Sequence, residues 1–135
     1  MVKESTIKNS VLTLENLYFD TIQFNRLDCI SSDPELDIRF RREVQQRTDD
    51  TSKYRLVLSA ELEDKERNSI RINISLVGEF NITVANREYD AERLVSENGV
   101  AILFPYLRSE ITLLTSQPGL KPVVLPAVNI VEMFK

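Results

Sequence analysis

The sequence predicts an α+β domain in which a four-stranded antiparallel sheet carries helices on one face. Apolar residues alternate with polar ones over residues 54–62 and 70–84, which is typical of strands with one buried and one solvated face. After Val84 the period changes, and a broad apolar segment over residues 100–116 indicates a helix. We therefore expect one domain over residues 1–135, with strands over about 11–84, helices over about 88–117 and an apolar tail over 120–135.

The first strand, over residues 11–25, is less regular than the others. Its apolar residues are twice separated by three positions, which resets the alternation. We expect a bend or bulge near Asn16 and another near Asp20. We also expect this strand to carry apolar residues on both faces, and therefore to bury one of them against a partner subunit.

A second strand is expected just after Pro34, where Leu36, Ile38 and Phe40 alternate with charged residues. In the last strand, Gly78 occupies a position where the alternation calls for an apolar side chain. We expect a bulge or a close approach of another backbone at this glycine.

The helical region divides into two parts in this interpretation. Residues 89–96 resemble a short helical turn that ends around Asn98 and Gly99, since glycine favours helix ends. A long helix then covers residues 100–116, and Pro105 within it should remove one hydrogen bond and kink or restart it. Its apolar face is wider than one small sheet requires. This surplus predicts oligomerisation, an apolar ligand, or both.

The composition argues against catalysis and against a metal or other cofactor. The chain has no histidine, one cysteine (Cys29) and three scattered glycines, so it lacks the residues for an ordinary zinc site, a histidine-based catalytic triad or a phosphate-binding glycine loop. Carboxylate chemistry stays formally open. However, Glu61 and Glu63 are interpreted as solvent-facing strand residues, and Asp49 and Asp50 as turn residues. We expect a protein that is not an enzyme.

The charge pattern argues against nucleic acid as the partner. The net charge is −4, and the only basic cluster is formed by Arg39, Arg41 and Arg42. On a strand these arginines would be split between its faces or lie on its solvated side, where they discourage aggregation. A lone cysteine and the lack of a long apolar run favour a cytoplasmic protein without membrane insertion.

Five segments resemble the SecB family of export chaperones, in the same order along the chain. The strongest is Ile102-Leu103-Phe104-Pro105-Tyr106-Leu107-Arg108, which resembles that family's ILFPYAR helix entry. Others begin at Pro34, Tyr54, Gly78 and Leu125, and the order of the resemblance is preserved from about Leu17 to Phe134.

The resemblance implies a four-stranded antiparallel sheet with packed helices that assembles as a homotetramer, a dimer of dimers. It also implies a chaperone that holds unfolded or preprotein polypeptides in apolar grooves without ATP. The candidate groove residues are Phe24, Leu27, Ile30, Leu36, Ile38, Phe40, Leu120, Val124 and Phe134. The candidate oligomer-interface residues are Leu17, Phe19, Ile72, Ile74, Leu76, Leu103, Tyr106 and Ile111. For both sets the alternative is packing in the core of the subunit.

Two departures from the family pattern put contact with the SecA motor in doubt. The positions that match the family's acidic motor-docking patch are Thr21, Asn25, Arg71 and Asn73, and none is a carboxylate. The family's second long helix and acidic tail are also not matched. Two alternatives therefore stay open: a dedicated chaperone for one partner, such as the antitoxin of a toxin–antitoxin pair, and a structural or scaffold subunit.

Overall fold

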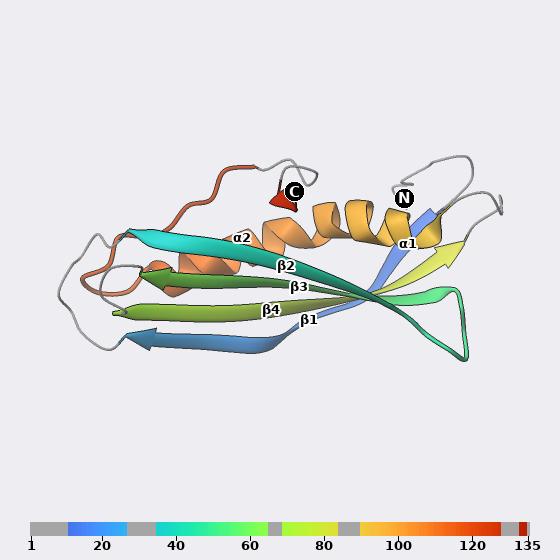
Figure 1. Ribbon diagram of the computed structural model, residues 1–135, viewed down its shortest axis with the longest axis horizontal. Helices are drawn as coiled ribbons and strands as arrows, with labels where there is room; N and C mark the ends of the chain where they lie inside the picture. Colours follow the sequence, from blue (N-terminus) through green and yellow to red (C-terminus); the bar gives the residue numbers. More distant parts are fainter. Residues whose placement is uncertain (1–10, 27–34, 65–68, 84–89, 128–132, 135) are drawn as a thin grey trace.

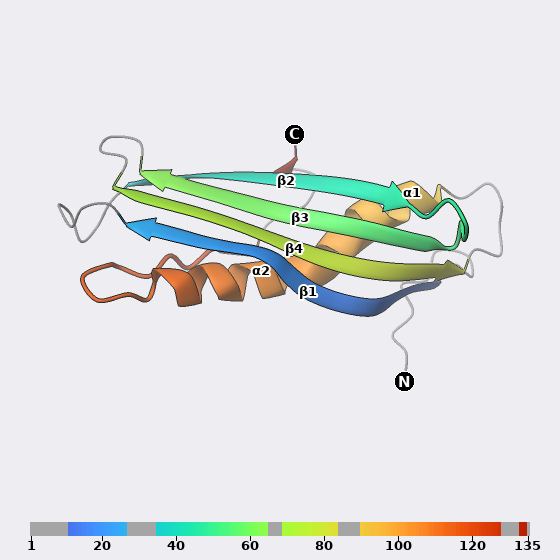
Figure 2. The same ribbon diagram turned by 90° about the horizontal axis from the view of Figure 1, so that it is seen from below.

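The computed structural model describes residues 11–26, 35–64, 69–83, 90–127 and 133–134. One four-stranded antiparallel sheet has the order β1-β4-β3-β2, and a helical segment lies across one of its faces (Figures 1 and 2). The strands are β1 (Val11–Arg26), β2 (Leu36–Gln46), β3 (Lys53–Asp64) and β4 (Ile70–Thr83). The helical segment comprises α1 (Ala91–Leu94), the π-helical η1 (Val95–Gly99) and α2 (Val100–Thr115). The expected α+β architecture is confirmed.

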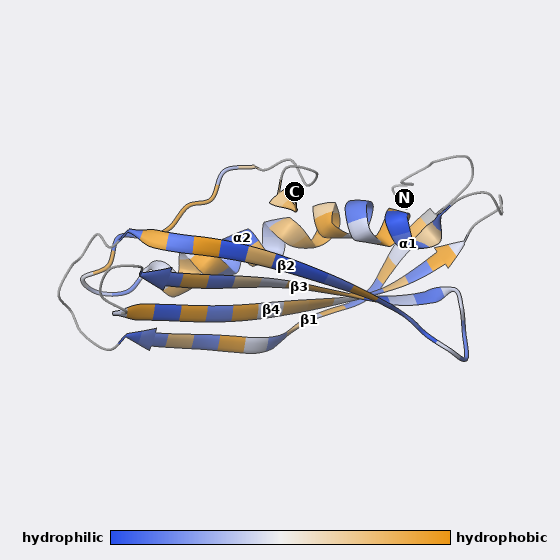
Figure 3. Ribbon diagram, in the orientation of Figure 1, coloured by the Kyte–Doolittle hydropathy of each residue, from blue (hydrophilic) through white to orange (hydrophobic). Residues whose placement is uncertain are grey.

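The alternation in β3 and β4 divides the sheet into a covered face, under the helices, and an open face. Even-numbered residues of both strands point to the covered face and form most of the core, among them Leu56, Phe80 and Ile72, all with no exposed surface. Odd-numbered residues point to the open face and are mainly polar. The banding of the strands in Figure 3 shows this alternation.

Strand β1 contains two irregularities, and both lie where the sequence predicted them. Its register against β4 shifts between Leu14 and Asn16 and again between Phe19 and Thr21. Apart from Tyr18, which aligns with Val77 on the open face, the large apolar residues of this strand lie on the covered face, whereas we expected them on both faces. Each extra residue flips the pleat, so Leu14, Phe19 and Ile22 all align with covered-face residues of β4.

Gly78 lies where a side chain of α2 packs directly against β4. A Cβ atom at this position would lie 2.8 Å from Cδ2 of Leu103 and 2.9 Å from Cε2 of Phe80. The register of β3 and β4 runs without a shift through Gly78. Of the two expectations for this glycine, close approach is therefore correct, although the approaching atoms belong to a side chain rather than to a backbone.

Gly99 does not end a helix, contrary to the expectation from the sequence. Its φ of −60° and ψ of −43° are helical, and the chain continues from η1 directly into α2. A Cβ at Gly99 would lie 2.9 Å from Cδ2 of Leu56, so this glycine lets η1 lie close to β3. α2 also continues through Pro105 without restarting.

The turn after α2 is fixed to both the sheet and the helix. Arg26, at the end of β1, donates from Nη1 to the carbonyl of Pro118 (2.8 Å) and from Nη2 to that of Gly119 (2.9 Å). Thr115 Oγ1 accepts a hydrogen bond from the backbone N–H of Val123 (2.8 Å). These bonds direct the apolar tail back along α2, toward the β2 side of the covered face (Figure 1).

Candidate functional site

The carboxylate pairs considered for catalysis do not form a reactive site. Asp49 and Asp50 lie in the exposed turn between β2 and β3, where hydrogen bonds from Arg47 and Ser52, respectively, lower their pKa values. Glu63 pairs with Arg71 across the open face (2.9 Å), and Glu61 is exposed. Among the residues that the structure describes, no cluster of three metal-ligating side chains occurs.

A hollow at the β2–β3 turn end of the sheet contains several charged groups, and two of them form an ion pair. Lys53 Nζ lies 2.7 Å from Glu15, and Asn16 donates to Glu79 (3.0 Å). Burial raises the pKa of Tyr54 in this hollow, with a smaller contribution from nearby carboxylates. Its hydroxyl therefore stays protonated at neutral pH.

An accessible apolar feature of the covered face runs along the edge strand β2, and we call it the β2 strip. Half-buried side chains of alternate residues form it, namely Leu36, Ile38, Phe40 and Val44. Phe40 packs edge-to-face on Phe104 of α2, with ring centroids 5.9 Å apart. Within the described residues β2 pairs only with β3, so its outer backbone edge is open to an extended chain.

The structure brings only part of the expected groove together. Leu36, Ile38 and Phe40 form the strip, and Phe134 packs beside it. Phe24 is half-buried on β1, at the opposite edge of the sheet.

The other expected groove residues are divided among different environments. Leu120 is buried at 8% exposure, whereas Val124 projects from the tail at 75% exposure. Leu27 and Ile30 lie outside the described residues.

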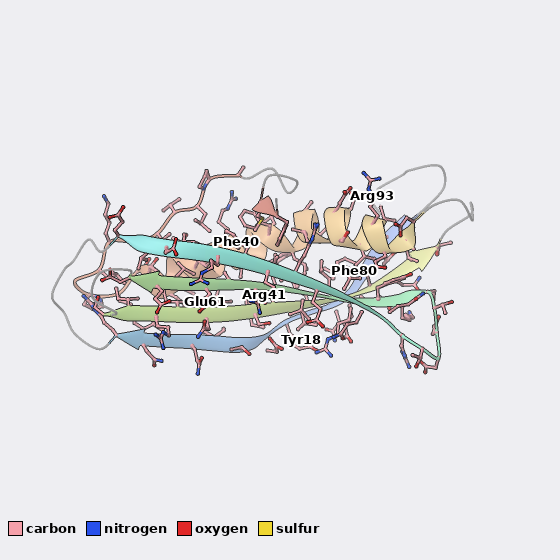
Figure 4. The ribbon with its side chains drawn as sticks, viewed as in Figure 1. Tyr18, Phe40, Arg41, Glu61, Phe80 and Arg93 are labelled. Carbon is pink, nitrogen blue, oxygen red and sulfur yellow. The ribbon has the colours of Figure 1, made fainter. Side chains whose placement is uncertain are left out.

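Arg42 is the residue of this region that the sequence interpretation missed. The sequence left open whether Arg42 lies on the same face as Arg39 and Arg41. Those two point to the open face, as Figure 4 shows for Arg41, whereas the register places Arg42 on the covered face with Phe40. Its guanidinium donates to the carbonyl of Ser96 (2.7 Å) and lies 4.4 Å from the ring centroid of Phe134. Its position in the alternation of β2 was the available signal.

Most of the expected interface residues are already buried within the single chain, which supports the core alternative for them. Exposure is at most 1% for Ile72, Ile74, Leu76, Leu103 and Ile111, so their side chains have no surface left for a partner. Leu17 and Phe19 are half-buried on the covered face of β1. Tyr106 is 50% exposed on α2, and Leu113, two turns further along, is 66% exposed. The apolar side chains that remain accessible for a subunit interface are therefore Tyr106 and Leu113 of α2 and the half-buried residues of β1.

Comparison with known proteins decides the family. Residues 6–135 match the family described as preprotein translocase subunit SecB. The chain belongs to the SecB family. No helix in the described part of the chain is long and apolar enough to cross a membrane.

Proteins similar to this SecB-family chain come from three different organisms. An uncharacterized protein of Methanocaldococcus jannaschii is 28% identical over 103 residues, which cover 73% of this chain but only 65% of that protein. A SecB-like chaperone of Mycobacterium tuberculosis, solved in complex with a peptide from an antitoxin, has a TM-score of 0.72 at 16% identity, with 87% of this chain and 88% of that chain covered. A Streptococcus agalactiae protein of unknown function gives 0.50 at 12% identity, covering 87% and 98%. The structural matches establish a shared fold.

The four positions that match the motor-docking patch of the SecB family lie on the open face. Asn25 pairs with Arg71 across β1 and β4, and Thr21 and Asn73 lie on the same face. Arg71 is held by Glu63, as described above, and Asn73 donates to Gln23 (3.3 Å). This face is polar and internally paired. The four positions do lie together, but without a carboxylate among them.

Proposed function

We propose that this protein is an ATP-independent holdase of the SecB type that binds unfolded or preprotein polypeptides. The observation that carries the proposal is the SecB-family match over residues 6–135. The half-buried apolar side chains beside an unpaired strand edge supply a surface of the right chemistry. The lone Cys29 favours the reducing cytoplasm as its location.

Holding a polypeptide requires no reaction chemistry. Each client methylene that is buried contributes about 0.8 kcal/mol, so several weak contacts sum to useful affinity. The backbone of an extended client can also form hydrogen bonds with the outer edge of β2. Such bonds do not depend on the sequence of the client. Such contacts suit a chaperone that must bind many unfolded chains.

The test is suppression of aggregation of a chemically unfolded client by stoichiometric amounts of the protein, without ATP. Ile38→Asn should weaken suppression because it places an amide in the β2 strip, whereas Arg39→Asn, its neighbour on the open face, should not. Melting temperatures would show that both variants are folded. No suppression by the wild-type protein at several-fold excess would refute the proposal.

A dedicated chaperone for one partner is the second candidate. It is favoured by the absence of carboxylates at Thr21, Asn25, Arg71 and Asn73, which weakens the case for a SecA-type motor as partner. Co-expression with the product of a neighbouring gene and co-purification would separate the two functions. A dedicated chaperone should retain that partner and ignore generic clients.

A homotetrameric assembly is part of this proposal. We expect its subunit interface to bury three accessible apolar side chains, namely the exposed Tyr106 and Leu113 on α2 and the half-buried Phe19 on β1. Sedimentation of the wild-type protein and of Tyr106→Ser should show a loss of mass in the variant. A structural scaffold subunit would bury all apolar surface in this assembly, so an apolar dye should find no site on the intact oligomer.

A further inference from the structure

Several polar groups of the open face pair with one another, but Arg39 and Arg41 of β2 do not. Both side chains are exposed, and in the part of the chain that the structure describes neither has a hydrogen bond or an ion pair. By contrast, Arg55 and Arg71 on the same face each donate to an oxygen of this chain, over 3.0 and 2.9 Å. Two neighbouring guanidiniums therefore keep their donors for water or for another molecule.

The two arginines face different groups across the sheet. Glu61 of β3 lies opposite Arg39, so a carboxylate is close to that cation. The row of open-face residues that begins at Arg41 crosses all four strands, and its other members are the hydroxyl residues Ser59, Ser75 and Thr21. This row therefore contains one cation, three hydroxyl groups and no carboxylate.

The row lies in a hollow of about 450 Å³, which we call the Arg41 hollow. Ser59 and Ser75 are half-buried, and within the described residues their hydroxyls have no hydrogen-bond partner. The next row toward the β2–β3 turn gives the hollow an apolar border, where Val57 is half-buried and Tyr18 is 37% exposed. Less water reaches a bound group from that side, and this strengthens the hydrogen bonds to it.

The charges around the Arg41 hollow favour a single anionic group. Its charged lining residues are Arg39, Arg41 and Glu61, which leaves one positive charge in excess. Glu43, two residues after Arg41, accepts a hydrogen bond from Gln45 over 3.0 Å. A nucleic acid would require a longer series of cations. One carboxylate matches the excess charge, and it can bind a guanidinium through two parallel hydrogen bonds.

We propose that the Arg41 hollow binds a carboxylate side chain from an acidic segment of a partner protein, with Arg41 as the cationic anchor and Ser59 and Ser75 as hydrogen-bond donors. This partner is opposite in charge to one that an acidic docking patch would attract. The hollow lies on the face opposite the β2 strip, so an acidic partner and an unfolded client can bind at the same time. The inference goes beyond the holdase function and does not depend on it.

The experiment measures fluorescence anisotropy of a labelled nine-residue peptide of glycine and serine with a central Glu-Ser-Glu segment, titrated with the full-length protein. A twin peptide with Gln-Ser-Gln has nearly the same shape without the charge. The wild-type protein should bind the first peptide and not the twin. Raising the salt concentration from about 0.05 to about 0.5 M should weaken binding, because ion pairs near a surface are screened.

Three substitutions test the anchor and the donors. Arg41→Gln should weaken binding by about 5- to 10-fold, which lies between the loss of an exposed ion pair and that of a buried charge-assisted hydrogen bond. Arg41→Lys keeps the charge but cannot form two parallel hydrogen bonds, so its affinity should lie between those of the wild-type protein and Arg41→Gln. Ser75→Ala removes one neutral donor and should weaken binding by about 2- to 5-fold.

Arg108→Gln is the matched control, because it makes the same change in net charge at a distant position. The guanidinium of Arg108 likewise has no partner in the described part of the chain, but it belongs to α2. This variant should leave peptide binding almost unchanged. Arg41→Gln, in turn, should suppress client aggregation as well as the wild-type protein does. Melting temperatures would show that all variants are folded.

Equal weakening by Arg41→Gln and Arg108→Gln, or equal binding of the two peptides, overturns the proposal, because either result would show attraction to the whole protein rather than to one site. No binding at the highest soluble protein concentration also overturns it. Displacement of the peptide by micromolar inorganic phosphate would assign the hollow to a phosphate group instead. None of these outcomes bears on the holdase function, which the suppression of aggregation tests separately.

Discussion

The contact between Gly78 and α2 makes a quantitative prediction for Gly78→Ala. In an ordinary strand this change stabilises the fold by about 0.5–1 kcal/mol, because glycine loses more chain entropy on folding. Here the new methyl group would lie 2.8 Å from Cδ2 and 3.1 Å from Cδ1 of Leu103, and 2.9 Å from Cε2 of Phe80. Leu103 and Phe80 have no exposed surface, so neither side chain has free space into which to move.

Such overpacking costs about 1–3 kcal/mol. After the gain in chain entropy is subtracted, the free energy of unfolding should fall by up to about 2.5 kcal/mol, and by about 1 kcal/mol for mid-range values. The change is measured by guanidinium denaturation at one fixed protein concentration, because self-association makes an apparent stability depend on concentration.

A double-mutant cycle tests the cause. Leu103→Ala alone should cost about 2–5 kcal/mol because it leaves a cavity. In that background the methyl group of Gly78→Ala no longer meets Leu103, so its own cost should fall to what the contact with Phe80 imposes. Additive effects of the two changes would refute the reasoning, because they would show that Gly78 and Leu103 do not compete for the same volume.

Three further predictions follow from single contacts. Arg26→Met removes two charge-assisted hydrogen bonds to the turn after α2 and should lower the free energy of unfolding by about 1–3 kcal/mol, measured by denaturation; no loss would show that the turn holds without them. Thr115→Val leaves the N–H of Val123 without its acceptor, so hydrogen exchange at that amide should accelerate while exchange in β3 and β4 stays unchanged. The pKa of Asp49 is held below its ordinary 3.8 by the hydrogen bond from Arg47. Its contribution to stability is therefore present above about pH 4 and is lost as the pH falls through the lowered value. A carboxyl titration by NMR should return toward the ordinary pKa in Arg47→Gln.

Local patterns predicted the elements of this fold well where the signal lies in a few neighbouring residues. The two breaks in the alternation of β1 located both register shifts, because an extra residue must flip the pleat. However, we took the same pattern to mean that the apolar residues of β1 are shared between its two faces, whereas most lie on one. Whether the apolar residues lie on one face or two depends on the partner strand, and that strand is remote in the sequence.

Gly99 shows a second limit of local reasoning. Glycine at the end of an apolar run is typical of a helix end, but here its missing Cβ is required by Leu56, more than forty residues away in the sequence. Likewise, Arg42 resembled a member of a solvated basic cluster. Its contacts with Ser96 and Phe134 exist only because β2, η1 and the tail meet.

The sequence by itself determined the class of the fold, the position of the strands and the family, since periodicity and the ordered motifs are properties of the chain. Only the tertiary structure decided how the strands are ordered, and that α2 buries Ile72, Ile74 and Leu76 within one subunit. It also decided which of the expected groove residues share a surface. The physical reason is that burial depends on contacts between distant segments. Alternation shows that a strand has two different faces, but the packing of the helix and the tail determines which face is covered and which residues remain free to bind.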